Sequence, residues 1–90
     1  MIQKITYSKL SQFDLDTLKI YISLNSNYSG LDFVVELVEY LDDLILFPNL
    51  GSDFDDNSKK LVYKKHFNVY YQILENEVII LRVLDSRRDF

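Results

Sequence analysis

The chain has 90 residues, of which 48% are hydrophobic, with two glycines, one proline and no cysteine. This length and composition fit one folded domain and exclude disulfides, thiolate metal sites and cysteine nucleophiles. The formal net charge of −4 argues against a protein that coats nucleic acid non-specifically. The total hides an asymmetry, because residues 1–58 carry a net charge of −7 and residues 59–90 a net charge of +3.

A short strand and a helix are predicted at the start of the chain. Residues 2–7 alternate two sets of side chains and are rich in β-branched types, which is typical of a strand. A helix follows, with Ser11 or Asp14 as its N-cap. Its buried face is predicted from a spacing of three and four residues, and consists of Leu15, Leu18, Tyr21 and Ile22.

A second helix is predicted after a break at residues 25–30, with Ser29 as its N-cap. Pro48 is expected to end it. Its apolar stripe is formed by Phe33, Val34, Leu37, Val38, Leu41 and Leu44 or Ile45. The opposite, solvent-facing side is acidic and carries Glu36, Glu39, Asp42 and Asp43.

The pattern then changes to a period of two after a polar loop at residues 49–58. Strands are predicted over residues 59–65, 67–74 and 78–84, joined by hairpins. Both faces of the last strand are largely apolar, so we expect it to be central and covered by helices on one side. The result is an α+β, two-layer domain with an N-terminal strand, two helices and an antiparallel three-stranded C-terminal sheet (β-α-α-β-β-β).

The chain contains no apolar run of membrane-spanning length and does not begin like a signal peptide. We therefore expect a cytoplasmic protein with no membrane contact. The acidic loop resembles a calcium-binding loop at Asp53, Asp55 and Asn57, but Lys64 occupies the place of the bidentate glutamate. We expect no metal site and no cofactor.

Three segments carry a family resemblance. Pro48-Asn49-Leu50-Gly51 follows an amphipathic helix, residues 67–73 read Phe-Asn-Val-Tyr-Tyr-Gln-Ile, and residues 79–89 end in Asp85-Ser86-Arg87-Arg88-Asp89. Together they resemble the RelE/ParE superfamily of bacterial type II toxins. The resemblance implies one toxin domain over residues 1–90 that a cognate antitoxin neutralises.

Two branches of this superfamily differ in their targets. ParE-like members inhibit DNA gyrase, whereas RelE-like members cleave messenger RNA in the ribosome. The closing Arg87-Arg88-Asp89 resembles the ParE side more. Asp85 stands where the superfamily often has histidine, and Asn68 stands where RelE-like enzymes often have arginine. The resemblance therefore implies a ParE-like toxin acting on a replication target such as gyrase. The alternatives are a RelE-like messenger RNA endonuclease and a degenerate, non-toxic binding module.

The candidate site residues lie mainly in the basic C-terminal half. We predict target contacts at Tyr70, Arg82, Arg87 and Arg88. Cations on neighbouring strands can form one basic patch, and catalytic candidates within it are Lys64, Lys65, His66 and Arg82. Arg82 interrupts an apolar strand, so it either faces a target or pairs with Asp85, Asp89 or a helix carboxylate. The acidic side of the second helix (Glu36, Glu39, Asp42 and Asp43) is predicted to bind a basic antitoxin segment.

Overall fold

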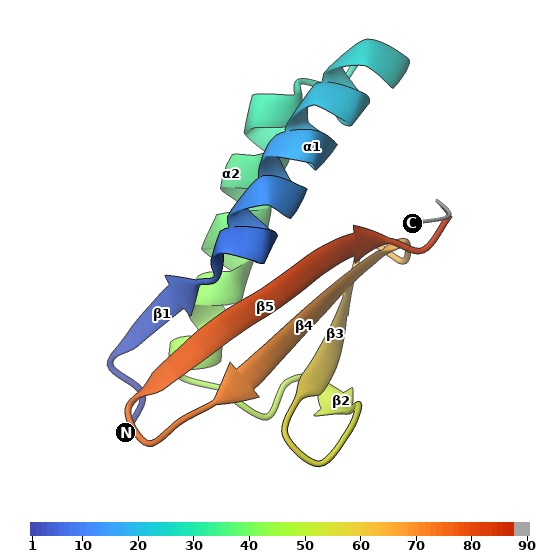
Figure 1. Cartoon of the computed structure of the whole chain (residues 1–90). Helices are drawn as coiled ribbons and strands as arrows, with labels where there is room; N and C mark the ends of the chain where they lie inside the picture. Colours follow the sequence, from blue (N-terminus) through green and yellow to red (C-terminus); the bar gives the residue numbers. More distant parts are fainter. Residues whose placement is uncertain (88–90) are drawn as a thin grey trace.

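The protein folds into a five-stranded mixed sheet with two helices packed on one face (Figure 1). The structure is a computed structural model that describes residues 1–87. The elements follow the chain as β1 (Lys4–Tyr7), α1 (Lys9–Asn25), α2 (Gly30–Leu41), the 3₁₀ turn η1 (Asp42–Ile45), β2 (Ser52–Asp53), β3 (Lys59–Tyr63), β4 (Phe67–Ile73) and β5 (Glu77–Asp85). The strand order is β1-β5-β4-β3-β2. The predicted α+β, two-layer arrangement is confirmed, and β5 lies inside the sheet as expected.

The sheet is larger than the three strands predicted for the C-terminal part. β1 runs parallel to β5 and pairs Lys4 with Glu77 through Tyr7 with Ile80. The predicted polar loop contributes the two-residue strand β2, which pairs with β3. Between the sheet and the helices lies a core whose centre includes the fully buried Leu37, Tyr71 and Ile80.

Helix α1 begins earlier than predicted, because Ser8 is its N-cap and the Ser8 hydroxyl accepts the Ser11 N–H. The prediction of Ser11 or Asp14 as the cap is wrong. Both residues lie inside the helix and are buried, Ser11 completely and Asp14 with 5% exposure. They share the buried face with Leu15 and Leu18, so two polar side chains face the sheet.

Helix α2 begins as predicted, with the Ser29 hydroxyl accepting the Asp32 N–H. The α-helix ends at Leu41, and η1 then carries the chain toward Pro48 with a tighter hydrogen-bond pattern. The two helices pack closely at Gly30, because a Cβ atom there would lie 1.9 Å from the Lys19 carbonyl oxygen.

A β-bulge in β5 changes which side chains face the helices. Tyr70 pairs with Arg82 and Tyr71 with Ile80, so Leu81 is the extra residue. As a result Ile80 and Val83 are both buried in the core, whereas Arg82 is only partly buried. The simple alternation predicted for this strand therefore fails after Ile80.

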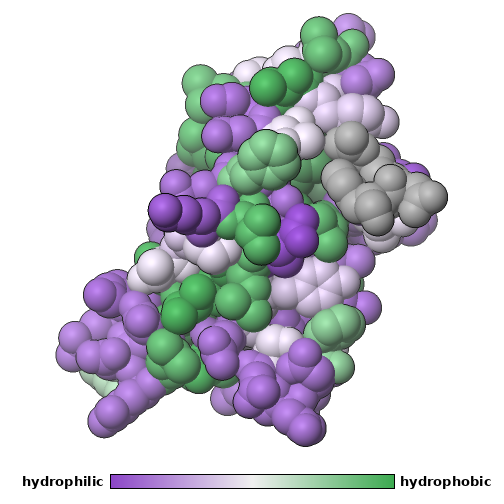
Figure 2. Space-filling view, viewed as in Figure 1, coloured by the Kyte–Doolittle hydropathy of each residue, from purple (hydrophilic) through white to green (hydrophobic). Residues whose placement is uncertain are grey.

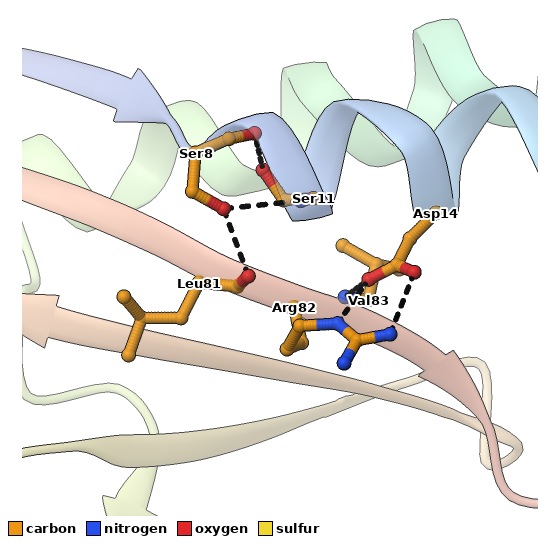
Figure 3. Close-up of polar contacts among 6 residues, drawn as sticks. All are labelled: Ser8, Ser11, Asp14, Leu81, Arg82 and Val83. Carbon is orange, nitrogen blue, oxygen red and sulfur yellow. Dashed lines mark hydrogen bonds and ion pairs between the residues drawn. The ribbon is translucent and has the colours of Figure 1, made fainter. Parts of the chain in front are cut away.

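Helix α1 closes the edge of β5 where β1 stops. The Ser8 N–H donates to the Ile80 carbonyl (3.0 Å) and the Ser8 hydroxyl to the Leu81 carbonyl (2.9 Å). Further along, the Asp14 carboxylate accepts the Val83 N–H at 3.0 Å (Figure 3). Ser8 and the Asp14 side chain thus replace hydrogen bonds that a longer β1 would make.

Within residues 1–87, neither helix has the length and apolar character needed to cross a membrane.

Candidate functional site

Arg82 forms an ion pair with Asp14 of α1. Its Nε donates to Asp14 Oδ2 at 2.8 Å and its Nη2 to Oδ1 at 3.0 Å, which is a bidentate geometry (Figure 3). The hydrogen bond to Asp14 raises the pKa of Arg82. Of the two interpretations of Arg82, the structure shows the pair with a helix carboxylate, although 38% of the arginine side chain stays exposed. Its predicted target and catalytic roles remain predictions.

Tyr70 lies on the sheet face that points away from the helices, because its neighbours Val69 and Tyr71 are buried in the core. The register pairs Lys60 with Tyr70 across β3 and β4, and Tyr70 with Arg82 across β4 and β5. The Tyr70 ring also meets the exposed Phe54 edge-on, with centroids 4.8 Å apart. Three adjacent strands therefore carry paired positions at Lys60, Tyr70 and Arg82, which we name the cross-strand row.

The turn between β3 and β4 places the other catalytic candidates. Lys64 and Lys65 adopt positive φ angles of 48° and 72°, a region that side chains other than glycine, asparagine and aspartate seldom enter. Lys64 Nζ lies 2.9 Å from Glu36 Oε2 and 5.4 Å from the centre of the Tyr28 ring. Its pKa is raised, chiefly by the hydrogen bond to Glu36. Lys65 is exposed, and the N–H of the half-buried His66 donates to the Lys64 carbonyl.

Arg87 is held by a buried carboxylate. The side chain of Asp85 is 1% exposed and accepts Arg87 Nε at 3.0 Å and Nη2 at 2.9 Å. The guanidinium lies over the Phe67 ring, 5.4 Å from its centre. Burial raises the pKa of Asp85, but the hydrogen bonds from Arg87 outweigh this effect and the net shift is downward. Arg88 lies outside the described residues.

A cavity of about 450 Å³ opens between the end of α1, the start of α2 and the β3–β4 turn. Lys64 and Arg87 provide its charged lining, and aromatic side chains including Tyr28, Phe33 and Phe67 provide most of the rest. We name this feature the cationic cavity. The predicted single basic patch is thus divided, because Arg82 belongs to the cross-strand row and Arg87 to the cavity. Sequence reasoning missed the cavity, since its lining comes from four separate segments.

The predicted antitoxin-binding residues are all exposed on α2 and η1: Glu36, Glu39, Asp42 and Asp43. Glu36 is engaged within the chain, because it accepts hydrogen bonds from Lys64 and from the Tyr28 hydroxyl. These contacts lower its pKa. The other three carboxylates extend along the helix and the 3₁₀ turn.

An exposed apolar row on α1 was not predicted. Its side chains are 57–78% exposed and recur at helical spacing, at Leu10, Phe13, Ile20 and Leu24. The signal for it in the sequence is the spacing of three, seven and four residues between these positions. In the view of Figure 2 hydrophobic surface reaches the end of the molecule where α1 ends, whereas the opposite end is mostly hydrophilic.

The sequence matches the family described as the ParE toxin of the type II toxin–antitoxin system parDE over residues 5–90. The fold is similar to a chain of the chromosomal ParDE toxin–antitoxin system from P. aeruginosa, with a TM-score of 0.76 and 20% identity over 93% of this chain and 96% of that chain. It is also similar to a chain of the E. coli DinJ–YafQ complex and to a YafQ mutant from E. coli. These have TM-scores of 0.59 and 0.58, each with 10% identity over 97% of this chain and 96% of the other.

No curated protein sequence matches the chain. At these identities the structural similarities support the fold, and the family match covers nearly the whole chain. The chain therefore belongs to the ParE toxin family of type II toxin–antitoxin systems.

Proposed function

We propose that the protein is a cytoplasmic toxin that stops growth by binding a replication target such as DNA gyrase, and that a cognate antitoxin neutralises it. The observation that carries the proposal is the engagement of Arg82 by Asp14. Cleavage of RNA would need cations that face the developing phosphorane charge together with a base and an acid. The strand arginine instead joins the helix to the sheet, and Asn68 carries no charge. This arrangement favours a toxin that acts by protein contact.

Two surfaces of the helices support an antitoxin partner. The carboxylates Glu39, Asp42 and Asp43 offer acidic contacts for a basic segment. The exposed apolar row on α1 offers a face on which an amphipathic or extended segment can bury side chains. A partner that covers either face would also remove exposed apolar or acidic surface from the free toxin.

Expression in a bacterial host tests both parts of the proposal. The chain alone is expected to arrest growth, and co-expression with the frame that neighbours its gene is expected to restore it. Purified protein should inhibit supercoiling by gyrase, and arrested cells should keep intact messages in primer extension. Growth arrest without any effect on gyrase would contradict the proposed target, and the absence of arrest would favour the non-toxic binding module.

The alternative RNA endonuclease has one observation in its favour, the cross-strand row. Lys60 is the register partner of Tyr70 on the neighbouring strand, and a tyrosine near a cation can stack a base while the cation meets a phosphate. Primer extension distinguishes the two functions, because an endonuclease would leave site-specific cuts in translated messages. Loss of those cuts in Tyr70→Ala and Lys60→Gln variants would assign the row to RNA.

A matched pair of variants tests the predicted target contacts of Arg87 and Arg88. Arg87→Ala with Arg88→Ala removes two positive charges at the C-terminal end, and Asp85→Asn is added so that the carboxylate that pairs with Arg87 is not left buried without its cation. Lys4→Ala with Lys9→Ala removes two charges from exposed positions on β1 and α1. Gyrase inhibition should fall at least about tenfold in the arginine variant, as expected when charge contacts are lost from a protein interface. Equal inhibition by the two variants would contradict these contacts.

A further inference from the structure

We propose that the cationic cavity is a receptor for a peptide carboxylate that stands next to an apolar side chain, and that the target protein supplies it. The identity of the partner that supplies the carboxylate rests on the proposed function, whereas recognition of a carboxylate by the cavity does not. Two fixed cations, Lys64 and Arg87, share the cavity with aromatic walls.

Both cations are held in place by a carboxylate and an aromatic ring. Glu36 and the Tyr28 ring hold the Lys64 ammonium, and Asp85 with the Phe67 ring holds the Arg87 guanidinium. Neither Glu36 nor Asp85 is part of the lining. A group that is already ordered loses little conformational entropy when a ligand binds, so the cavity is preorganised.

Both cations also keep donors that make no hydrogen bond to another residue within 1–87. A guanidinium has five N–H groups, and Asp85 engages one on Nε and one on Nη2, which leaves the outer edge of the fork. An ammonium has three, and Glu36 engages one of those on Lys64. The outer edge of a guanidinium matches a second carboxylate in bidentate geometry.

The local charge favours a single carboxylate over a polyphosphate. Glu36 and Asp85 already balance Lys64 and Arg87, so the cavity offers donors without excess positive charge. Binding of nucleic acid depends on excess positive charge, and this chain carries a net −4. The aromatic walls, with Phe33 and Phe67 nearly buried behind the opening, suit an apolar side chain.

The turn conformation agrees with this role. Two consecutive lysines adopt positive φ, a backbone conformation that is unfavourable for residues with a Cβ atom and is not for glycine. Such a turn is usually built from asparagine and glycine. Here the conformation places the Lys64 ammonium over the Tyr28 and Tyr63 rings. Backbone strain of this kind is concentrated at functional sites in proteins.

Small probes on the full-length protein test the cavity without any partner. The side-chain carboxylate is supplied by N-acetyl-aspartyl-phenylalaninamide, the chain-terminal carboxylate by N-acetyl-phenylalanine, and the neutral control by N-acetyl-asparaginyl-phenylalaninamide. Chemical-shift titration of the ¹⁵N-labelled protein should show shifts at the amides of Tyr28, Lys64 and Phe67. We expect a Kd on the order of 1 mM for at least one carboxylate probe, and at least about tenfold weaker binding of the control.

Variants identify the groups responsible. Lys64→Gln should weaken probe binding at least about fivefold, whereas Lys65→Gln removes the same charge from the same turn and should leave it unchanged. Because Arg87→Gln alone would strand the buried Asp85, the arginine is tested as Asp85→Asn with Arg87→Gln, after thermal unfolding shows that this variant is folded. The Lys64→Gln variant and the variant with Asp85→Asn and Arg87→Gln should also lose affinity for the gyrase subunit that the wild type binds.

Three results would overturn the proposal. Equal binding of the neutral and acidic probes would show that no carboxylate is recognised, and no binding of any probe would remove the receptor altogether. Tighter binding of adenosine monophosphate than of either acidic probe would assign the cavity to a nucleotide. Probe binding in a protein that leaves gyrase unaffected would keep the cavity and reject the proposed target, so the two failures are distinguishable.

Discussion

Replacing Arg82 by glutamine should destabilise the fold, because it leaves the Asp14 carboxylate buried without its cation. Breaking a fully buried ion pair costs roughly 3–5 kcal/mol. Two features reduce this value here, since 38% of the arginine side chain is exposed and the Val83 N–H still donates to Asp14. We therefore expect a loss of about 2 kcal/mol in the free energy of unfolding. For a domain of this length, the loss corresponds to a fall in Tm on the order of 10 °C.

Urea unfolding followed by circular dichroism measures this loss, and a double-mutant cycle isolates the pair. Asp14→Asn should cost about as much as Arg82→Gln, and the double variant should cost at least about 1 kcal/mol less than the sum of the two. Lys60→Gln is the control, because Lys60 also flanks Tyr70 but has no ion-pair partner among residues 1–87. It should change the unfolding free energy by less than about 0.5 kcal/mol.

Two results would refute this account. An unfolding free energy for Arg82→Gln within about 0.5 kcal/mol of the wild type would show that the pair does not hold α1 to β5. Additive effects in the cycle would show that Asp14 and Arg82 act separately. Loss of growth arrest at unchanged stability would instead assign Arg82 to a target contact.

Three further predictions concern other positions. Gly30→Ala should lower the free energy of unfolding by roughly 3 kcal/mol, because the new Cβ would collide with the Lys19 carbonyl. A urea unfolding curve of the variant that matches the wild-type curve would contradict this. Tyr7→Phe should keep or raise stability by up to about 1 kcal/mol, since the buried Tyr7 hydroxyl has no hydrogen-bond partner among residues 1–87. Burial raises the pKa of Tyr7 to about 12, so the variant should also lose a phenol that ionises late in an alkaline titration. The pKa of Asp85 is lowered in the folded state, so its stabilising effect is present above its unfolded value of 3.8 and disappears as the pH falls through the folded pKa. Asp85→Asn should therefore flatten the fall in stability below about pH 4, and an unchanged acid limb would contradict the pairing with Arg87.

Local signals predicted most of the fold. Ser29 was recognised as a cap because its hydroxyl satisfies a local N–H, and α2 was recognised from its apolar stripe. The α1 cap was missed because Ser11 and Asp14 are also good capping residues, and only the packing against β5 shows that they are buried. The bulge at Leu81 was missed because a period of two contains no sign of an inserted residue.

The candidate site was less predictable, because its contacts join distant parts of the chain. Arg82 and Asp14 lie 68 residues apart, and the sequence offered three kinds of partner for the arginine. The cationic cavity depends on a turn conformation that two lysines do not suggest. The residue types of the site were therefore visible in the sequence, whereas their grouping depended on register, the bulge and the turn.

The closure of the β5 edge by α1 has a consequence for misfolding. Because a helix rather than a strand covers this edge, any partly unfolded form that releases α1 uncovers the N–H and C=O groups of residues 81–85 together with Val83. An uncovered, apolar strand edge is a template for pairing with another chain. Asp14 variants should consequently aggregate during refolding at concentrations at which the wild type refolds without aggregation, so one buried carboxylate protects the chain against aggregation.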